Sequence, residues 1–103
     1  VAATLRAALA DAKVEPSRVG LVQASANGVP WVDAAEEAAL AELFGPAPRV
    51  ERPKLLVGEN PCSGALQLAL AARALREEPS LGAVVVNSLG AGGNQIAVVL
   101  TAP

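Results

Sequence analysis

Residues 19–33 read VGLVQASANGVPWVD, and this stretch gives the clearest indication of the fold class. It opens on a short apolar run, Val19–Gln23, which predicts a buried strand. Residues 24–32 carry Asn, Gly and Pro, which are typical of a loop. Asp33 stands three residues before Glu36, and this capping-box pattern predicts a helix that begins at Asp33. A buried strand, a loop and a helix in this order indicate an α/β fold.

The rest of the chain repeats the alternation of helices and apolar strands. We expect helices over residues 2–13, from Asp33 to Gly45 and over residues 64–78. We expect further strands over Pro53–Val57, Ala83–Leu89 and Ile96–Thr101. The segment 64–78 is apolar on nearly every side, as in a helix packed between two layers. Together these segments predict a mixed sheet covered by helices on both faces.

Composition excludes several classes of function. The chain has 103 residues, of which 52% are hydrophobic and 17% charged, so it is a small domain too apolar for disorder. A net charge of −2 with no basic block gives nucleic-acid binding no support. The chain has no histidine, which excludes imidazole chemistry and histidine metal sites, and no apolar run reaches the length of a membrane span. The single cysteine, Cys62, excludes an internal disulfide and fits a reducing compartment. We expect a cytoplasmic protein with no cofactor, metal, nucleic-acid or membrane partner.

Four short motifs follow one another along the chain. They are QASANGVPWVD (23–33), an Asp-x-x-Glu helix that ends at Phe44-Gly45, KLLVGE (54–59) and NSLGAGG (87–93). This order resembles the C-terminal part of a β-ketoacyl synthase, a family with the thiolase fold, over nearly the whole chain. The resemblance implies that residues 1–103 form the C-terminal segment of that fold and that its N-terminal half is absent.

The resemblance also places three residues in an altered active site. Ketosynthases carry one catalytic histidine in a His-Gly-Thr-Gly-Thr-Pro loop and another in a Lys-x-x-x-Gly-His run. Ser25 and Glu59 stand at these two positions, and Lys54 matches the lysine. The family histidines donate hydrogen bonds to the developing enolate and thioester oxyanions. Ser25 is short and uncharged, and Glu59 could donate only if its pKa were strongly raised. The resemblance therefore implies that the ordinary ketosynthase chemistry is lost or altered.

Five residues match the loop that borders the acyl pocket in that family: Leu89, Gly90, Ala91, Gly92 and Gly93. Ala91 stands where the family has a gating phenylalanine. The loop joins two strands, so no helix N-terminus is available to bind a phosphate there. Cys62 lies near the start of a helix, where a thiolate is favoured. The family nucleophile lies in the absent half, however, and we expect Cys62 to be a small buried residue.

Three functions remain open. The first is a non-catalytic subunit, similar to a chain-length factor, that pairs with a ketosynthase in polyketide or fatty-acid chain elongation. Its partners would be the N-terminal half of the same fold or an active ketosynthase, together with an acyl carrier protein, and we expect a dimer. The second is a divergent β-ketoacyl synthase or acyltransferase that uses Ser25, Lys54 and Glu59. The third is a protein-binding module that uses an exposed apolar face.

Overall fold

The computed structural model describes residues 1–103, except for the side chain of Ala91. Its helices are α1 (Ala2–Ala12), α2 (Pro30–Phe44), α3 (Lys54–Val57) and α4 (Ser63–Glu77). Its strands are β1 (Val19–Gln23), β2 (Arg49–Glu51), β3 (Ala83–Leu89) and β4 (Gln95–Thr101). Short 3₁₀ turns occupy Pro16–Arg18, Pro79–Leu81 and Ala91–Gly93. Among the helices described, none is long and apolar enough to cross a membrane.

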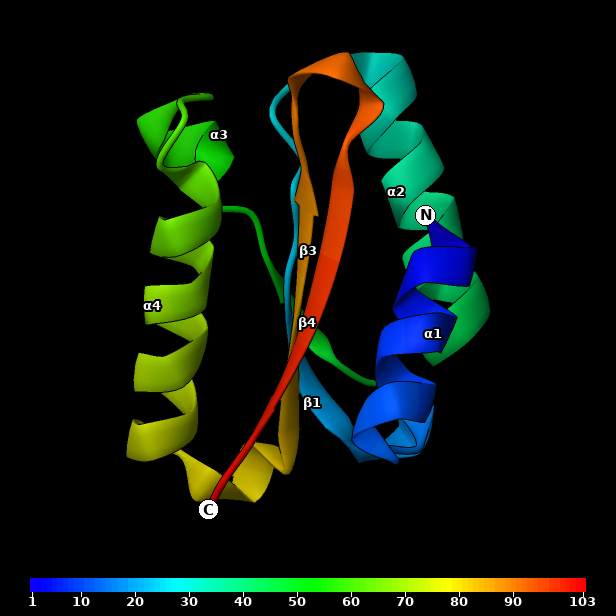
Figure 1. The fold of residues 1–103 in the computed structure, drawn as a ribbon, viewed down its shortest axis with the longest axis vertical. Helices are drawn as coiled ribbons and strands as arrows, with labels where there is room; N and C mark the ends of the chain where they lie inside the picture. The colour runs from blue at the N-terminus through cyan, green and yellow to red at the C-terminus, as the bar shows by residue number, and fades with distance from the viewer.

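The four strands form one mixed sheet in the order β2-β1-β3-β4. β1 runs parallel to both β2 and β3, whereas β3 and β4 are antiparallel. Helices α1 and α2 cover one face of the sheet and α4 covers the other (Figure 1). The expected α/β fold, a mixed sheet with helices on both faces, is confirmed.

Alternating residues of the two central strands divide the core between the two faces. Val22 of β1 and Val85 of β3 are fully buried in the cluster with α1 and α2. Leu21 of β1 and Val84 of β3 are fully buried in the cluster with α4. Full burial of such a side chain contributes about 1.5–3 kcal/mol, so this alternation fixes which helix covers which face.

A close backbone approach brings β1 beside the turn that precedes β3. A Cβ atom on Gly20 would lie 2.4 Å from the carbonyl oxygen of Leu81, so no larger residue fits at this position. The register then runs in step from Leu21 beside Val84 to Gln23 beside Val86. As a result, the carboxyl ends of β1 and β3 meet at the same edge of the sheet.

The strand expected over Pro53–Val57 is wrong. The edge strand β2 lies earlier, at Arg49–Glu51, and residues 54–57 form the short helix α3. Pro53 has a helical φ of −63°, and its carbonyl accepts hydrogen bonds from the amides of Leu56 and Val57. The apolar residues of α3 are exposed, Leu56 by 90%. Their apolar character was therefore not a sign of a buried strand.

The capping box expected at Asp33 is also wrong. Helix α2 begins at Pro30, a residue whose fixed φ suits the first helical position. The Asp33 carboxylate instead accepts hydrogen bonds from the amides of Asn27 and Gly28, at 3.0 Å and 2.9 Å. Glu36, only 2% exposed, turns into the protein interior. The acidic pair thus holds the loop that precedes the helix and does not cap the helix itself.

Helix α4 is buried on one side only within this chain. Gln67, Ala71 and Leu75 face the sheet and are buried. On the opposite side Ala65 and Ala69 are exposed, and Leu68 is 38% exposed. The prediction that two layers enclose this helix is therefore wrong for the chain by itself, which leaves an apolar helical face uncovered.

Candidate functional site

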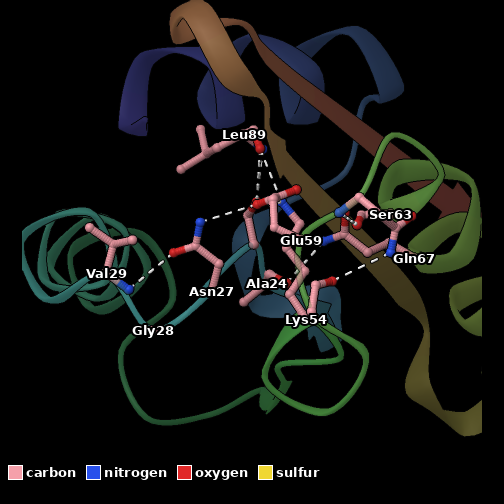
Figure 2. A network of polar contacts seen from close by, with 12 residues as sticks. Ala24, Asn27, Gly28, Val29, Lys54, Glu59, Ser63, Gln67 and Leu89 are labelled. Carbon is pink, nitrogen blue, oxygen red and sulfur yellow. Dashed lines mark hydrogen bonds and ion pairs between the residues drawn. The ribbon is translucent and has the colours of Figure 1, made fainter.

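The predicted site residues meet at the carboxyl ends of β1 and β3. Ser25 follows β1, Lys54 opens α3, Glu59 lies in the loop between α3 and α4, and Leu89 ends β3. Figure 2 shows Lys54, Glu59 and Leu89 converging from these separate elements. The sheet topology thus brings the three predicted positions into one hydrogen-bonded network.

The centre of this network is the ammonium group of Lys54, which is only 3% exposed. Its Nζ donates to Ser25 Oγ at 2.7 Å, to Glu59 Oε2 at 3.0 Å and to the carbonyl oxygen of Leu89 at 3.0 Å. An ammonium group has three protons to donate. All three are therefore committed within the protein.

Ser25 is equally engaged. Its Oγ accepts from Lys54 Nζ and from the amide of Leu89, the latter at 2.9 Å, and it donates to the Leu89 carbonyl at 3.4 Å. Ser25 is 1% exposed. The hydroxyl therefore links the end of β3 to α3 and has no proton left for a bound molecule.

Glu59 balances the charge of Lys54 from the solvent side. Its side chain is 46% exposed, and its Oε2 also accepts a hydrogen bond from Asn27 Nδ2 at 3.1 Å. Burial by itself raises the pKa of Glu59, but the hydrogen bonds from Lys54 and Asn27 and the charge of Lys54 outweigh burial and leave that pKa below its ordinary value. Glu59 is therefore an anion at neutral pH, and it does not provide the protonated donor that catalysis would need.

A second group of polar side chains, the buried Glu36 and Asn87 and the half-buried Gln95, supports the network. Glu36 Oε2 accepts from the amide of Ser25 at 2.7 Å and from Asn87 Nδ2 at 2.5 Å, and Gln95 Nε2 donates to Asn87 Oδ1 at 3.0 Å. This buried carboxylate therefore holds the Ser25 backbone in place.

Gln67 of α4 joins the ends of the two central strands. Its Nε2 donates to the carbonyls of Ala24 and Asn87, each at 2.9 Å. Asn87 in β3 and Gln67 in α4 each stand out in the sequence as a polar residue within an apolar run. Sequence reasoning missed the hydrogen-bonding roles of these two residues, and it also missed the hydrogen bond from Asn27 to Glu59.

A pocket of about 470 Å³ opens beside the network. Lys54 and Glu59 form part of its wall, and Ser63, Ser88 and Leu89 form other parts. Of the five residues of the predicted acyl-pocket loop, Leu89 and Gly90 line this pocket. Gly92 and Gly93 are exposed and take positive φ values of 80° and 82°, and the side chain of Ala91 lies outside the described part of the chain.

Cys62 does not take part in the site. It is exposed, so the expectation of a buried residue is wrong. Its amide donates to Asn60 Oδ1 at 2.9 Å, which makes it part of the turn that leads into α4. Among the described residues, no group of three acidic, cysteine or histidine side chains is arranged to hold a metal ion.

The family model for the C-terminal domain of β-ketoacyl synthase matches residues 1–80. This chain belongs to that family. The chain is 45% identical over 78 residues to the tetracenomycin polyketide synthase ketoacyl synthase beta subunit of Streptomyces glaucescens, a match over 74% of this chain and 19% of the relative. A Streptomyces violaceoruber protein designated granaticin polyketide beta-ketoacyl synthase 2 is 43% identical over 74 residues, which are 69% of this chain and 18% of the relative. The matched part thus spans about a fifth of the length of these relatives. The expected resemblance to ketosynthases of the chain-length-factor type is confirmed.

Proposed function

We propose that this chain is the C-terminal segment of a non-catalytic ketosynthase β subunit. It completes the thiolase fold together with an N-terminal half, and the assembled subunit pairs with an active ketosynthase in polyketide chain elongation, where an acyl carrier protein delivers the growing chain. We place this assembly in the cytoplasm. The observation that carries the proposal is the closed network of Lys54, Ser25 and Glu59.

The network supports a non-catalytic role because it offers no donor where the chemistry would need one. Oxyanion stabilisation requires a hydrogen-bond donor aimed at the place where negative charge develops. Lys54 and Ser25 spend their protons on protein oxygens, and Glu59 is ionised. A carboxylate at this position opposes the formation of an enolate.

The exposed apolar surface supports the pairing. Leu68 is 38% exposed on α4, and Leu55 and Val57 of α3 are 53% and 56% exposed. Exposed apolar patches are typical of interaction sites, and these side chains are the candidates for such a patch. The curated relatives are about five times as long as the matched part of this chain. In a protein of that length, further segments would be available to cover this apolar surface.

The pairing is tested by co-purification. We would express the chain with its N-terminal half and an active ketosynthase, place an affinity tag on this chain, and measure how much ketosynthase is retained. Leu68→Asp, which puts a charge on the uncovered face of α4, should abolish retention. Ala7→Asp is the matched control, because Ala7 is exposed on α1, and it should retain the partner. Absence of the ketosynthase from the wild-type eluate, or equal retention by the two variants, would refute the pairing.

One observation favours the second function, a divergent acyltransferase. Ser25 Oγ lies 2.7 Å from Lys54 Nζ, which is within the range of a nucleophile and its activating base. Against this role, Ser25 is 1% exposed, and Lys54 Nζ acts as a donor in its hydrogen bonds to Ser25 Oγ, Glu59 Oε2 and the Leu89 carbonyl. A general base must accept the serine proton, so we rank this function second.

A further inference from the structure

The loop between β1 and α2 contains the dipeptide Asn27-Gly28, whose chemical lability plays no part in the proposed function. Asparagine followed by glycine is chemically labile, because glycine has no side chain to hinder attack of its backbone nitrogen on the asparagine side chain. Gly28 is exposed with a φ of +95°, and a Cβ atom placed on it would meet nothing closer than Leu55 Cδ2 at 3.9 Å. The loop is therefore exposed and sterically unhindered at the site where deamidation would occur.

We propose that Asn27 is a site of spontaneous deamidation that Asp33 and Glu59 restrain, and that the reaction alters the Lys54 network. In the first step the Gly28 nitrogen bonds to Cγ of Asn27, the bond from Cγ to Nδ2 breaks, and ammonia leaves with the proton that Gly28 loses. Water then opens the resulting succinimide ring to give aspartate or isoaspartate. No oxidant or reductant is needed.

Four hydrogen bonds hold the loop in an unreactive arrangement. The Gly28 amide donates to Asp33 Oδ2 at 2.9 Å, so the attacking nitrogen keeps its proton and its position. The Asn27 amide donates to the other oxygen of the same carboxylate at 3.0 Å. The Asn27 side chain is fixed at both ends, since Oδ1 accepts from Val29 at 3.1 Å and Nδ2 donates to Glu59 at 3.1 Å (Figure 2). The reaction requires local opening of these contacts, and its rate follows the population of the open loop.

The product changes the site because Asn27 is one of the two hydrogen-bond donors to Glu59. The aspartate product replaces the amide donor with a second carboxylate beside Glu59. Like charges repel, so Glu59 is pushed away from its contact with the buried ammonium of Lys54. An isoaspartate would also lengthen the backbone two residues after Ser25. Deamidation is therefore a chemical change that loosens the network without any substitution.

The test follows isoaspartate and aspartate at residue 27 by peptide mapping of the whole chain, incubated at neutral pH, folded and in urea. We expect the urea-unfolded chain to react at least about tenfold faster than the folded chain, the rate ratio for a barrier lower by about 1.4 kcal/mol. Asp33→Ala should accelerate the folded chain by about the same factor, since a hydrogen bond to a charged group is lost. Glu37→Ala removes the same charge from an exposed position on α2 and is the matched control.

Two further measurements separate local opening of the loop from unfolding of the whole chain. The reaction at Asn94, which precedes Gln95, serves as an internal reference, because global unfolding would accelerate both sites. Asp33→Ser keeps one accepting oxygen and should react at an intermediate rate if Asp33→Ala does not fold. Equal rates in the folded and unfolded wild type, or a rate in both Asp33 variants no higher than in Glu37→Ala, would overturn the restraint.

The consequence for the network is tested with Asn27→Asp, which reproduces one product. We expect a lower thermal midpoint than the wild type and partial recovery in high salt, because salt screens the repulsion from Glu59. Asn27→Ala removes the same donor without adding charge, and its loss of stability should not respond to salt. An Asn27→Asp variant as stable as the wild type at low salt would overturn this part of the proposal.

Discussion

At the scale of single residues, the site is a closed arrangement built around one buried cation. Lys54 donates hydrogen bonds to the Ser25 hydroxyl, the Glu59 carboxylate and the Leu89 carbonyl, and so joins α3 to the end of β3. A buried charge is tolerated only when it is paired and hydrogen-bonded. Ser25 and Glu59 are therefore the two side chains whose contacts make burial of Lys54 possible.

Replacement of Ser25 by histidine should not fit this arrangement. Ser25 is 1% exposed, and its Oγ makes three hydrogen bonds that an imidazole cannot reproduce in the same place. We expect Ser25→His to lower the free energy of unfolding by about 1–3 kcal/mol, the range for overpacking a filled interior. Urea denaturation provides the measurement, with Ser80→His, at an exposed position, as the control. Equal stability of the two variants would show that the pocket has room for the imidazole.

The lowered pKa of Glu59 predicts a pH dependence of stability. A carboxyl group whose folded-state pKa is depressed contributes stability above its ordinary pKa, 4.5 here, and that contribution is lost as the pH falls through the folded value. The contribution is about 1 kcal/mol or less, because Glu59 is nearly half exposed. Glu59→Gln should therefore be less stable than the wild type at neutral pH, and the difference should vanish in acid. A difference that stays constant from neutral pH into acid would contradict this assignment.

At the scale of elements, the strands could be read from the sequence more reliably than the segments around the site. β1 and β3 were predicted with their observed bounds because each is a short apolar run that is buried on both faces of the sheet. The segment 54–57 was misread because its exposed apolar residues imitate a buried strand. Lys54 and Glu59 are only five positions apart, so the contact between them is local. The roles of Asn27 and Gln67 could not be predicted, because they depend on which carbonyls and carboxylates the fold brings to them.

Gln67 of α4 hydrogen-bonds the ends of both central strands, which gives a direct test. Gln67 is fully buried and its Nε2 bonds to the carbonyls of Ala24 and Asn87. Gln67→Leu leaves these buried carbonyls short of a donor, which costs about 1–3 kcal/mol. Arg76→Leu on the exposed side of the same helix should be near neutral. Chemical denaturation of both variants measures the difference, and equal stabilities would show that Gln67 does not stabilise the strand ends.

At the scale of the whole molecule, the chain buries a hydrophobic core but leaves large apolar side chains exposed on α4 and β4. The sheet ends on the apolar strand β4, and Ile96 on this strand is 63% exposed. Exposed edge strands and apolar helical faces are surfaces that proteins ordinarily cover. The uncovered face of α4 and the edge of β4 are therefore the parts of the fold that we expect a further segment or subunit to complete. The sequence indicated this through the apolar composition of residues 64–78, although this chain alone does not bury them.

Malonyl decarboxylation distinguishes a non-catalytic subunit from an active enzyme. We would measure carbon dioxide release from a malonyl thioester of acyl carrier protein, using this chain joined to its N-terminal half and no partner ketosynthase. Lys54 and Ser25 already donate their protons to protein oxygens, and Glu59 is ionised. We therefore predict no turnover above the background measured without protein. Neither Ser25→Ala nor Glu59→Gln should change this result. Turnover well above that background that disappears in either variant would contradict the account and identify the network as an active site.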